Sequence, residues 1–333
     1  ASGPGRAPAL MSSLLALLLL GAAPDPWALP AARPCTAAEL AELTDAATTP
    51  WRLTCRAVLA PGQAIVRPIL IEGAEASGAG LDCNGGAIGR PGLAVTTRQP
   101  TIAVWSRRIT AEHWSGPTDI RVTNCVIHGA VRVWGMGADG SYDDLRASSR
   151  TAAHTATTQG AAPSHIELDR VTIVGTGSIP LYVGPGVTRL SLTRSTLSGR
   201  SDATALYLDA ESADTRIEDN AIAVATRREV IAVDGSARNR ITGNRIHLKG
   251  RPGVFLYRNC GERGVIRHQT PSDNQITDNV FSGAARLRPQ LVVVGSREGR
   301  RSYCGEDRGY PFGSSADDGD RATNNVVARN LRR

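Results

Sequence analysis

Aromatic residues, lysine and long apolar runs are all scarce in this chain of 333 residues. Phe, Trp and Tyr make up 4% of it and are not interleaved with basic residues, which argues against a surface that stacks nucleic-acid bases. The apolar run from Leu14 to Leu20 is too short to cross a bilayer, so we expect no membrane span. Phosphate-binding glycine loops, a nucleophile elbow and zinc-site spacings are also missing from the sequence, and we predict no metal centre of that kind.

Lysine occurs once, at Lys249, so the formal net charge of +7 comes almost entirely from arginine. Arginine makes planar, bidentate contacts with carboxylates and phosphates, which lysine cannot make. The composition therefore favours an acidic ligand, although an Arg-rich and Ala-rich chain can also reflect the base composition of its genome.

Residues 1–32 are typical of a secretory signal peptide. Met11 precedes a leucine-rich run, and small residues follow up to Ala31 or Ala32. The ten residues before Met11 are consistent with a start assigned too far upstream. We expect an exported protein, either periplasmic or secreted, in which disulfides can form.

The six cysteines are candidates for disulfides. We pair Cys35 with Cys55, which flank a predicted helix, and Cys260 with Cys304, which lie in two insertions. Cys83 and Cys125 either form a third bridge between adjacent coils or remain two buried thiols.

A short phrase recurs through the second half of the chain: an apolar residue, Asn three positions later, and another apolar residue two further on. Its copies are Ile217/Asn220/Ile222, Ile241/Asn244/Ile246, Ile276/Asn279/Phe281 and Val327/Asn330, with degenerate copies starting at Val122, Leu168 and Leu192. From Leu168 to Ile241 the first positions are spaced by 24, 25 and 24 residues, which indicates stacked repeats. We expect the Asn side chains to bond from one turn to the next across the ~4.8 Å strand spacing.

Short apolar alternations separated by Gly, Asn, Asp and Ser predict many short strands between these phrases. An all-β solenoid, a single-stranded parallel β-helix over 58–333, is the economical fold. Thr36 and Glu39 form a capping-box pattern, so residues 33–57 should supply a helical cap for the open end. Insertions are expected at 136–163, 259–273 and 296–324, and we expect a monomer.

With these repeats and phrases such as Asn239-Arg240-Ile241-Thr242-Gly243-Asn244-Arg245-Ile246, roughly residues 60 to 333 resemble the right-handed parallel β-helix proteins of the pectate-lyase-like superfamily. The resemblance implies that fold and a polysaccharide ligand, often an acidic one. Members of the superfamily include lyases, hydrolases, epimerases and proteins that bind without known catalysis. The chain has none of the signatures of those enzymes, so the resemblance implies a substrate class and not a reaction.

The second strands of successive coils align as Leu181–Gly184, Leu206–Asp209, Ile231–Asp234, Phe255–Arg258 and Val292–Gly295. Positions one and three are apolar and should point inward, so positions two and four should point outward. Position four then places Asp209, Asp234 and Arg258 on three consecutive rungs of an exposed face. We predict that this column is catalytic. A Ca²⁺ site and a structural salt-bridge ladder are the alternatives.

Further candidates surround this column. Tyr182 and Tyr207 occupy position two on adjacent rungs and would offer aromatic surface to a sugar ring. The insertion 259–273 begins directly after Arg258 and contains His268, a candidate base; the insertion 136–163 is interpreted as a flap or a surface loop. The remaining candidates for substrate contact are Glu211, Tyr257 (at an inward position in this alignment), Arg251 and Arg263.

The leading hypothesis is an enzyme that cleaves or modifies an anionic polysaccharide. In β-elimination, Arg258 would neutralise the uronate while Tyr257, His268 or a neighbouring Arg removed the proton. In hydrolysis, Asp209 and Asp234 would act as the carboxylate pair. A non-catalytic glycan-binding protein and a structural solenoid are the other hypotheses; pairing of both aspartates with arginines and the lack of a concavity would favour the latter. No cofactor other than Ca²⁺ is considered.

Overall fold

The computed structural model describes residues 1, 3, 33–283, 288–296 and 321–333. Nearly all of the predicted signal peptide, most of the insertion 296–324 and Cys304 lie outside the described residues. Within the described part, no helix is long and apolar enough to span a membrane.

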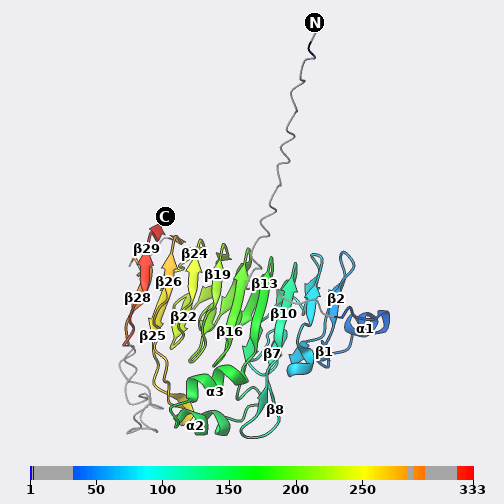
Figure 1. Cartoon of the computed structure of the whole chain (residues 1–333), viewed down its shortest axis with the longest axis horizontal. Coiled ribbons are helices and arrows are strands. Elements are labelled where there is room, and N and C mark those ends of the chain that lie inside the picture. Colours follow the sequence, from blue (N-terminus) through cyan, green and yellow to red (C-terminus); the bar gives the residue numbers. More distant parts are fainter. Residues whose placement is uncertain (2, 4–32, 284–287, 297–320) are drawn as a thin grey trace.

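The chain winds through three sheets in turn, and each coil contributes one strand to each sheet (Figure 1). Sheet 1 contains β1 (Trp51–Arg52), β4 (Ile69–Glu72), β7 (Ile102–Trp105), β12 (Val131–Trp134), β15 (Leu181–Val183), β18 (Leu206–Leu208), β22 (Ile231–Asp234), β25 (Val254–Tyr257) and β28 (Val292–Val294). Sheet 2 contains β2 (Arg56–Val58), β5 (Gly80–Asp82), β10 (Thr118–Thr123), β13 (Ser164–Asp169), β16 (Thr188–Thr193), β19 (Arg216–Glu218), β23 (Arg240–Thr242), β26 (Gln275–Thr277) and β29 (Val326–Ala328). Sheet 3 contains β3 (Ala64–Ile65), β6 (Ala87–Ile88), β11 (Val126–His128), β14 (Thr172–Gly177), β17 (Thr196–Ser201), β20 (Ala221–Ile222), β24 (Arg245–His247), β27 (Val280–Ser282) and β30 (Leu331–Arg332), with β21 (Ala225–Thr226) beside β17.

The strands of these three sheets pair in parallel with the equivalent strands of the neighbouring coils. This confirms the predicted fold, a single-stranded right-handed parallel β-helix. Its core is a stack of aliphatic side chains: in sheet 1, for example, Leu206 pairs with Ile231 and Leu208 with Val233, and all four are 0% exposed. Each buried side chain of this size stabilises the fold by roughly 1.5–3 kcal/mol, so the stack is the main source of stability.

The predicted Asn ladder is present at the turn between sheets 2 and 3. The Asn244 Oδ1 atom accepts hydrogen bonds from the backbone N–H and the Nδ2 of Asn220, both at 3.0 Å. Asn244 Nδ2 in turn donates to Asn279 Oδ1 (2.9 Å) and to the Ile217 carbonyl (2.8 Å). The amides therefore connect successive coils, as the sequence predicts.

A second ladder, not predicted, lies at the other end of sheet 2. Asn239 donates to Asn274 Oδ1 (2.8 Å), and Asn274 donates to Asn325 Oδ1 (3.1 Å). Each member stands five residues before a member of the first ladder, so the strands of sheet 2 in these coils are flanked by amides at both ends.

The N-terminal end of the solenoid is covered by α1 (Ala37–Leu43), as predicted. Thr36 and Glu39 form the expected capping box, and Leu43 packs against the core. The disulfide Cys35–Cys55 is present nearby.

Cys83 and Cys125 form a disulfide between neighbouring coils and are not two buried thiols. Cys260 is also disulfide-bonded, while its predicted partner Cys304 lies outside the described residues.

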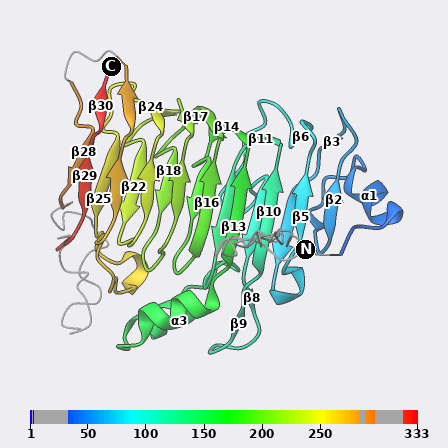
Figure 2. The same ribbon diagram turned by 45° about the horizontal axis from the view of Figure 1, so that its top comes forward.

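Several insertions leave the solenoid on one side (Figure 2). They form the 3-10 helix η1 (Ala74–Ala76), the antiparallel hairpin β8 (Arg107–Arg108) and β9 (Trp114–Ser115), the helices α2 (Asp143–Ser149) and α3 (His154–Ala161), and the 3-10 helix η2 (Glu262–Gly264). The 136–163 segment is thus neither a flap without apolar anchor nor a simple loop. It has a small core of its own, in which Met136, Leu145 and Ala161 cluster with Trp114 of the hairpin.

Candidate functional site

The insertions 136–163 and 259–273, here called the lid, lie over the outward face of sheet 1. They are joined to each other by hydrogen bonds from Arg146 Nε to the Arg263 carbonyl (2.6 Å) and from the Ile266 N–H to Ser149 Oγ (3.0 Å). The β8–β9 hairpin supports the lid from the side, because Arg108 and the Trp114 indole both bond to Asp144.

Between the lid and sheet 1 is a pocket of about 240 Å³. Its sheet side is formed by β12, β15 and β18 and its lid side by both insertions. The lining residues include Arg132, Trp134, Tyr142, His154, Tyr182, Tyr207, Asp209, Glu211, Arg228, Glu262 and Arg267.

Asp209 and Asp234 lie on adjacent rungs and are joined by a guanidinium from the lid. Arg267 Nη1 donates to Asp209 Oδ1 (2.8 Å) and lies 2.9 Å from Asp234 Oδ2. The hydroxyl of Tyr182 donates to Asp209, and that of Tyr207 donates to Asp234. Each carboxylate is therefore held by a cation and a phenol.

Burial governs the protonation of this cluster. It raises the pKa of Asp234 to about 6, opposed by Arg267 and reinforced by Asp209. Burial acts against the charge of Arg267, but the two carboxylates outweigh it and raise the Arg267 pKa well above its ordinary value. Burial also raises the pKa of Tyr182 and Tyr207 well above the usual range, each with the neighbouring Asp adding to the effect.

The predicted exposure of the column is wrong. Asp209, Asp234 and Arg258 are 8%, 0% and 3% exposed, because the 259–273 insertion folds back over the sheet and places Arg267 on the two carboxylates. A Ca²⁺ ion does not fit between Asp209 and Asp234, since the guanidinium and two hydroxyl groups already donate to their oxygens.

The predicted register of one strand is also wrong. Tyr257, and not Arg258, pairs with Asp234, so the alignment of Phe255–Arg258 was displaced by one residue. Tyr257 consequently points outward and is covered; its hydroxyl accepts from Arg228 Nη2 at 2.8 Å and lies 3.4 Å from the Tyr207 hydroxyl. Arg258 is buried just beyond the column.

The other predicted site residues lie in different places. Tyr182 and Tyr207 stack with ring centroids 5.8 Å apart, as expected for an aromatic surface, and line the pocket. Glu211 lines it too, but its carboxylate holds the lid: it accepts the backbone N–H of His268 (2.7 Å) and of Gln269 (3.1 Å).

His268, Arg263 and Arg251 are not among the pocket-lining residues. His268 Nε2 lies 2.7 Å from the Ser149 carbonyl, to which it donates, and its ring packs 4.9 Å from that of His154. The Arg263 guanidinium lies over the Tyr142 ring at 4.0 Å, and Arg251 is exposed on a turn.

His154 does line the pocket and is 1% exposed. Burial, with a contribution from His268, lowers the His154 pKa to about 3, so its imidazole is neutral near pH 7. Its Nδ1 lies 3.0 Å from Ser148 Oγ and 3.2 Å from Thr158 Oγ1.

Arg132 of β12 is a pocket residue that the sequence alignment missed although it follows the repeat. Its guanidinium carbon lies 4.2 Å from the Trp134 ring centroid and 4.0 Å from that of Tyr182, and the residue is 9% exposed. In the described part of the chain it forms no salt bridge and its buried Nε has no hydrogen-bond partner; burial lowers its pKa. The signal was available, because Val131-Arg132-Val133-Trp134 repeats the alternation of Leu181–Gly184 one coil earlier.

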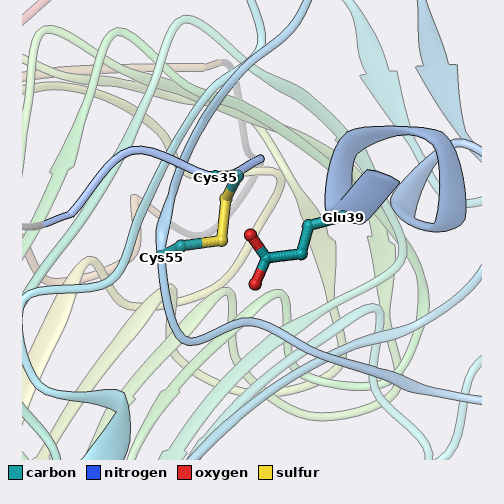
Figure 3. Close-up of side chains that lie close together, drawn as sticks. All are labelled: Cys35, Glu39 and Cys55. Atoms are coloured by element: carbon teal, nitrogen blue, oxygen red, sulfur yellow. A yellow bond between two sulfur atoms is a disulfide. The ribbon is translucent and has the colours of Figure 1, made fainter. Parts of the chain in front are cut away.

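One further group of potential metal ligands, Cys35, Glu39 and Cys55, lies near α1 (Figure 3). The two sulfur atoms form a disulfide, and the Glu39 carboxylate bonds to Arg33 (2.8 Å) and to the Thr36 N–H (2.7 Å). This group therefore has a structural role and does not fit a metal ion.

No protein-family model and no curated protein sequence matches the chain. Solved structures that match include the A-module of the mannuronan C-5 epimerase AlgE4 from Azotobacter vinelandii, at 10% identity over 89% of this chain and 91% of that one, with a TM-score of 0.31. A mutant of the periplasmic alginate epimerase AlgG matches at 11% identity over 86% of this chain and 79% of that one, with a TM-score of 0.22.

Proposed function

We propose that this protein binds an acidic unit of a polysaccharide in the pocket beneath the lid, with Arg132 contacting the carboxylate, and that it cleaves or modifies the bound chain. The observation that carries the proposal is the environment of Arg132. It is a buried guanidinium in a pocket, and it forms no salt bridge with the described residues.

A buried charge without a counterion is costly, and an anionic ligand would supply the missing charge. The rings of Trp134 and Tyr182 hold the guanidinium in place, which favours planar recognition of a carboxylate. Aromatic rings in the same pocket suit the C–H face of a sugar. An acidic sugar combines both features.

Proton abstraction beside the carboxylate, as in a lyase or an epimerase, has better support than hydrolysis. Hydrolysis needs two carboxyl groups flanking the scissile bond, but of the predicted pair Asp209 lines the pocket and Asp234 does not. Glu211 and Glu262 line it as well, and the Glu211 carboxylate already accepts the N–H groups of His268 and Gln269. For proton abstraction, Arg132 and Arg267, which both line the pocket, would stabilise an enolate. Tyr182 would accept the proton from the sugar carbon while its own proton passes to Asp209 Oδ2.

The test combines binding with turnover on alginate, pectate and glucuronan. We expect one of them to bind, and an increase in unsaturated-uronate absorbance if the reaction is elimination. The Arg132→Gln variant should bind the glycan about 10–100-fold more weakly, the effect of losing a charged hydrogen bond. Arg251→Gln, on an exposed turn outside the pocket, is the matched control and should bind normally. Absence of binding to every acidic glycan would refute the proposal.

A binding protein without catalysis is the second candidate. It is favoured because the carboxylates of Asp209 and Asp234 are already hydrogen-bonded within the protein. Arg267 contacts both of them, Tyr182 donates to Asp209, and Tyr207 donates to Asp234. Asp209→Asn would then leave affinity unchanged, and no product would form from any glycan. A purely structural solenoid has weaker support, because both aspartates do pair with an arginine but a pocket is present beside them.

We also infer that the protein is exported. The two described disulfides, Cys35–Cys55 and Cys83–Cys125, support an oxidising compartment, in agreement with the signal-like composition of residues 11–32.

A further inference from the structure

A second pocket, of about 320 Å³, lies on the outward face of sheet 1 nearer the N-terminal end. Its floor consists of outward-facing residues of β4 and β7, Leu70, Ala103 and Trp105. One wall is the segment from Gly89 to Thr101, which leaves the solenoid before β7.

This second pocket is next to the one that contains Arg132, with no strand between them. Arg132 pairs with Ala103, which pairs with Leu70, and Trp134 pairs with Trp105. Neighbouring strands are ~4.8 Å apart, so the two floors form one outward face that runs along the solenoid axis. A single extended ligand can therefore occupy both pockets.

The floor of the second pocket is apolar although it faces outward. Sheet 2 shows the contrast, because its outward positions along the solenoid hold charged residues such as Arg121, Glu167 and Arg240. Among the described residues, no Asp or Glu lines the second pocket, and its arginines, Arg90 and Arg98, are exposed at the rim. Leu93 stands beside them, 56% exposed to solvent.

Few hydrogen-bonding groups lie at the floor, and the buried Trp105 Nε1, a donor, has no hydrogen-bond partner among the described residues. Thr101, the polar residue next to β7, already donates its hydroxyl to the His128 carbonyl at 2.6 Å. A sugar unit with free hydroxyls would place O–H donors over Leu70 and Ala103 without acceptors, at a cost of about 1–3 kcal/mol for each unsatisfied group. The free donor, Trp105 Nε1, suits the carbonyl oxygen of an ester. A sugar whose hydroxyls are esterified has no such donors and gains from the apolar contact.

We propose that the second pocket binds an O-acylated sugar unit, adjacent in the chain to the acidic unit at Arg132. The ligand is then an acidic oligosaccharide that carries ester substituents. This inference depends on the proposed function, because the first pocket must hold the acidic unit.

The test uses the acidic oligosaccharide that binds the full chain, in O-acetylated form and after mild alkaline removal of its acetyl groups, with affinities measured by calorimetry. The wild-type protein should bind the acetylated form about tenfold more tightly. Leu93→Ser should reduce this preference at least threefold. Leu331→Ser is the matched control, since Leu331 is 55% exposed at the far end of the solenoid, and it should keep the preference.

The outcomes separate the two proposals. Equal affinity for both forms, with binding still dependent on Arg132, would overturn the acyl proposal and leave the acidic site intact. The acyl proposal would also be overturned if Leu93→Ser kept the full preference for the acetylated form, as Leu331→Ser should. Failure of both forms to bind would refute the acidic site itself, and with it both proposals.

Discussion

Arg267 joins the lid to the solenoid through two buried carboxylates. In Arg267→Met, Asp209 and Asp234 would lose their cation while remaining in a site closed to solvent. Removing one partner of a buried ion pair costs about 3–5 kcal/mol. We therefore expect the free energy of unfolding at pH 7 to fall by about that amount. Urea denaturation measures it.

The matched variant carries Asp209→Asn and Asp234→Asn together with Arg267→Met. It has no unpaired charge and should regain most of the lost stability. A loss below about 1 kcal/mol in Arg267→Met would show that solvent or another residue replaces the guanidinium.

His154 gives the fold a dependence on pH. Its pKa is about 3 in the folded protein, against an ordinary value of 6.5, so the folded state resists protonation of this ring. The stability that His154 contributes is therefore present above pH 6.5 and is lost as the pH falls towards 3. Between pH 7 and pH 5 the wild-type protein should lose about 2 kcal/mol more than His154→Gln.

Urea denaturation of both proteins at the two pH values tests this. His113→Gln, at an exposed histidine, is the control and should behave like the wild-type protein. An acid-induced loss that is the same with and without His154 would show that the buried ring does not control it.

The candidate site was predictable only where its residues follow the repeat. Asp209, Asp234, Tyr182 and Tyr207 stand at regular positions, and the alignment brought them together. The strand Val254–Tyr257 is apolar at every position, so alternation does not fix its register, and a slip of one residue moved Tyr257 to the wrong face. Arg267 was out of reach because it lies in an insertion, where no period relates sequence position to place.

At the scale of elements, the Asn ladders join each coil to the next through buried hydrogen bonds. Asn244 lies at the middle of the first ladder and is 0% exposed, whereas Asn330 is half-buried on the last rung. Asn244→Ala leaves the backbone N–H of Asn220 and the Asn279 amide oxygen without their partner. We expect a loss of about 3 kcal/mol, since each buried unsatisfied group costs ~1–3 kcal/mol.

Asn330→Ala is the comparison, and it should cost under about 1 kcal/mol, because water can reach the groups that it leaves. Thermal unfolding of both variants measures the difference. Equal losses would mean that the ladder stabilises through local turn geometry and not through bonds between coils.

The same elements explain which parts of the fold the sequence predicted. The inward aliphatic positions recur in the regular coils and the Asn phrase in the later ones, so a short pattern specified the solenoid. The cap was specified separately, by the capping box of Thr36 and Glu39. The helices α2 and α3 were missed because they have few apolar residues, and Leu145 and Ala161 pack against Trp114 of the hairpin. Trp114 also bonds to Asp144 of α2, thirty residues further along the chain. Contacts of that kind leave no periodic signal.

At the scale of the whole molecule, the two ends of the solenoid differ, although Cys260 in a late coil is disulfide-bonded too. Cys35–Cys55 and Cys83–Cys125 tie the first coils together, while the last coil exposes Val294, Val326, Val327 and Leu331. In a solenoid each coil contacts mainly its neighbours, so stability is distributed along the axis and can differ between its ends. The C-terminal strands β28, β29 and β30 should therefore be the first to exchange their amide hydrogens.

Removing one crosslink tests how far its effect travels. The Cys83–Cys125 bridge spans 42 residues, and closing a loop of that length stabilises by about 4 kcal/mol in the chain-entropy model. In Cys83→Ala/Cys125→Ala we expect hydrogen exchange to accelerate in β2, β5 and β10, which surround the bridge, and to change little in β19 and β23. Asn244→Ala should give the opposite distribution. Equal acceleration in all coils of either variant would mean that the solenoid unfolds as one cooperative unit, because only then does a local loss lower the protection of distant strands.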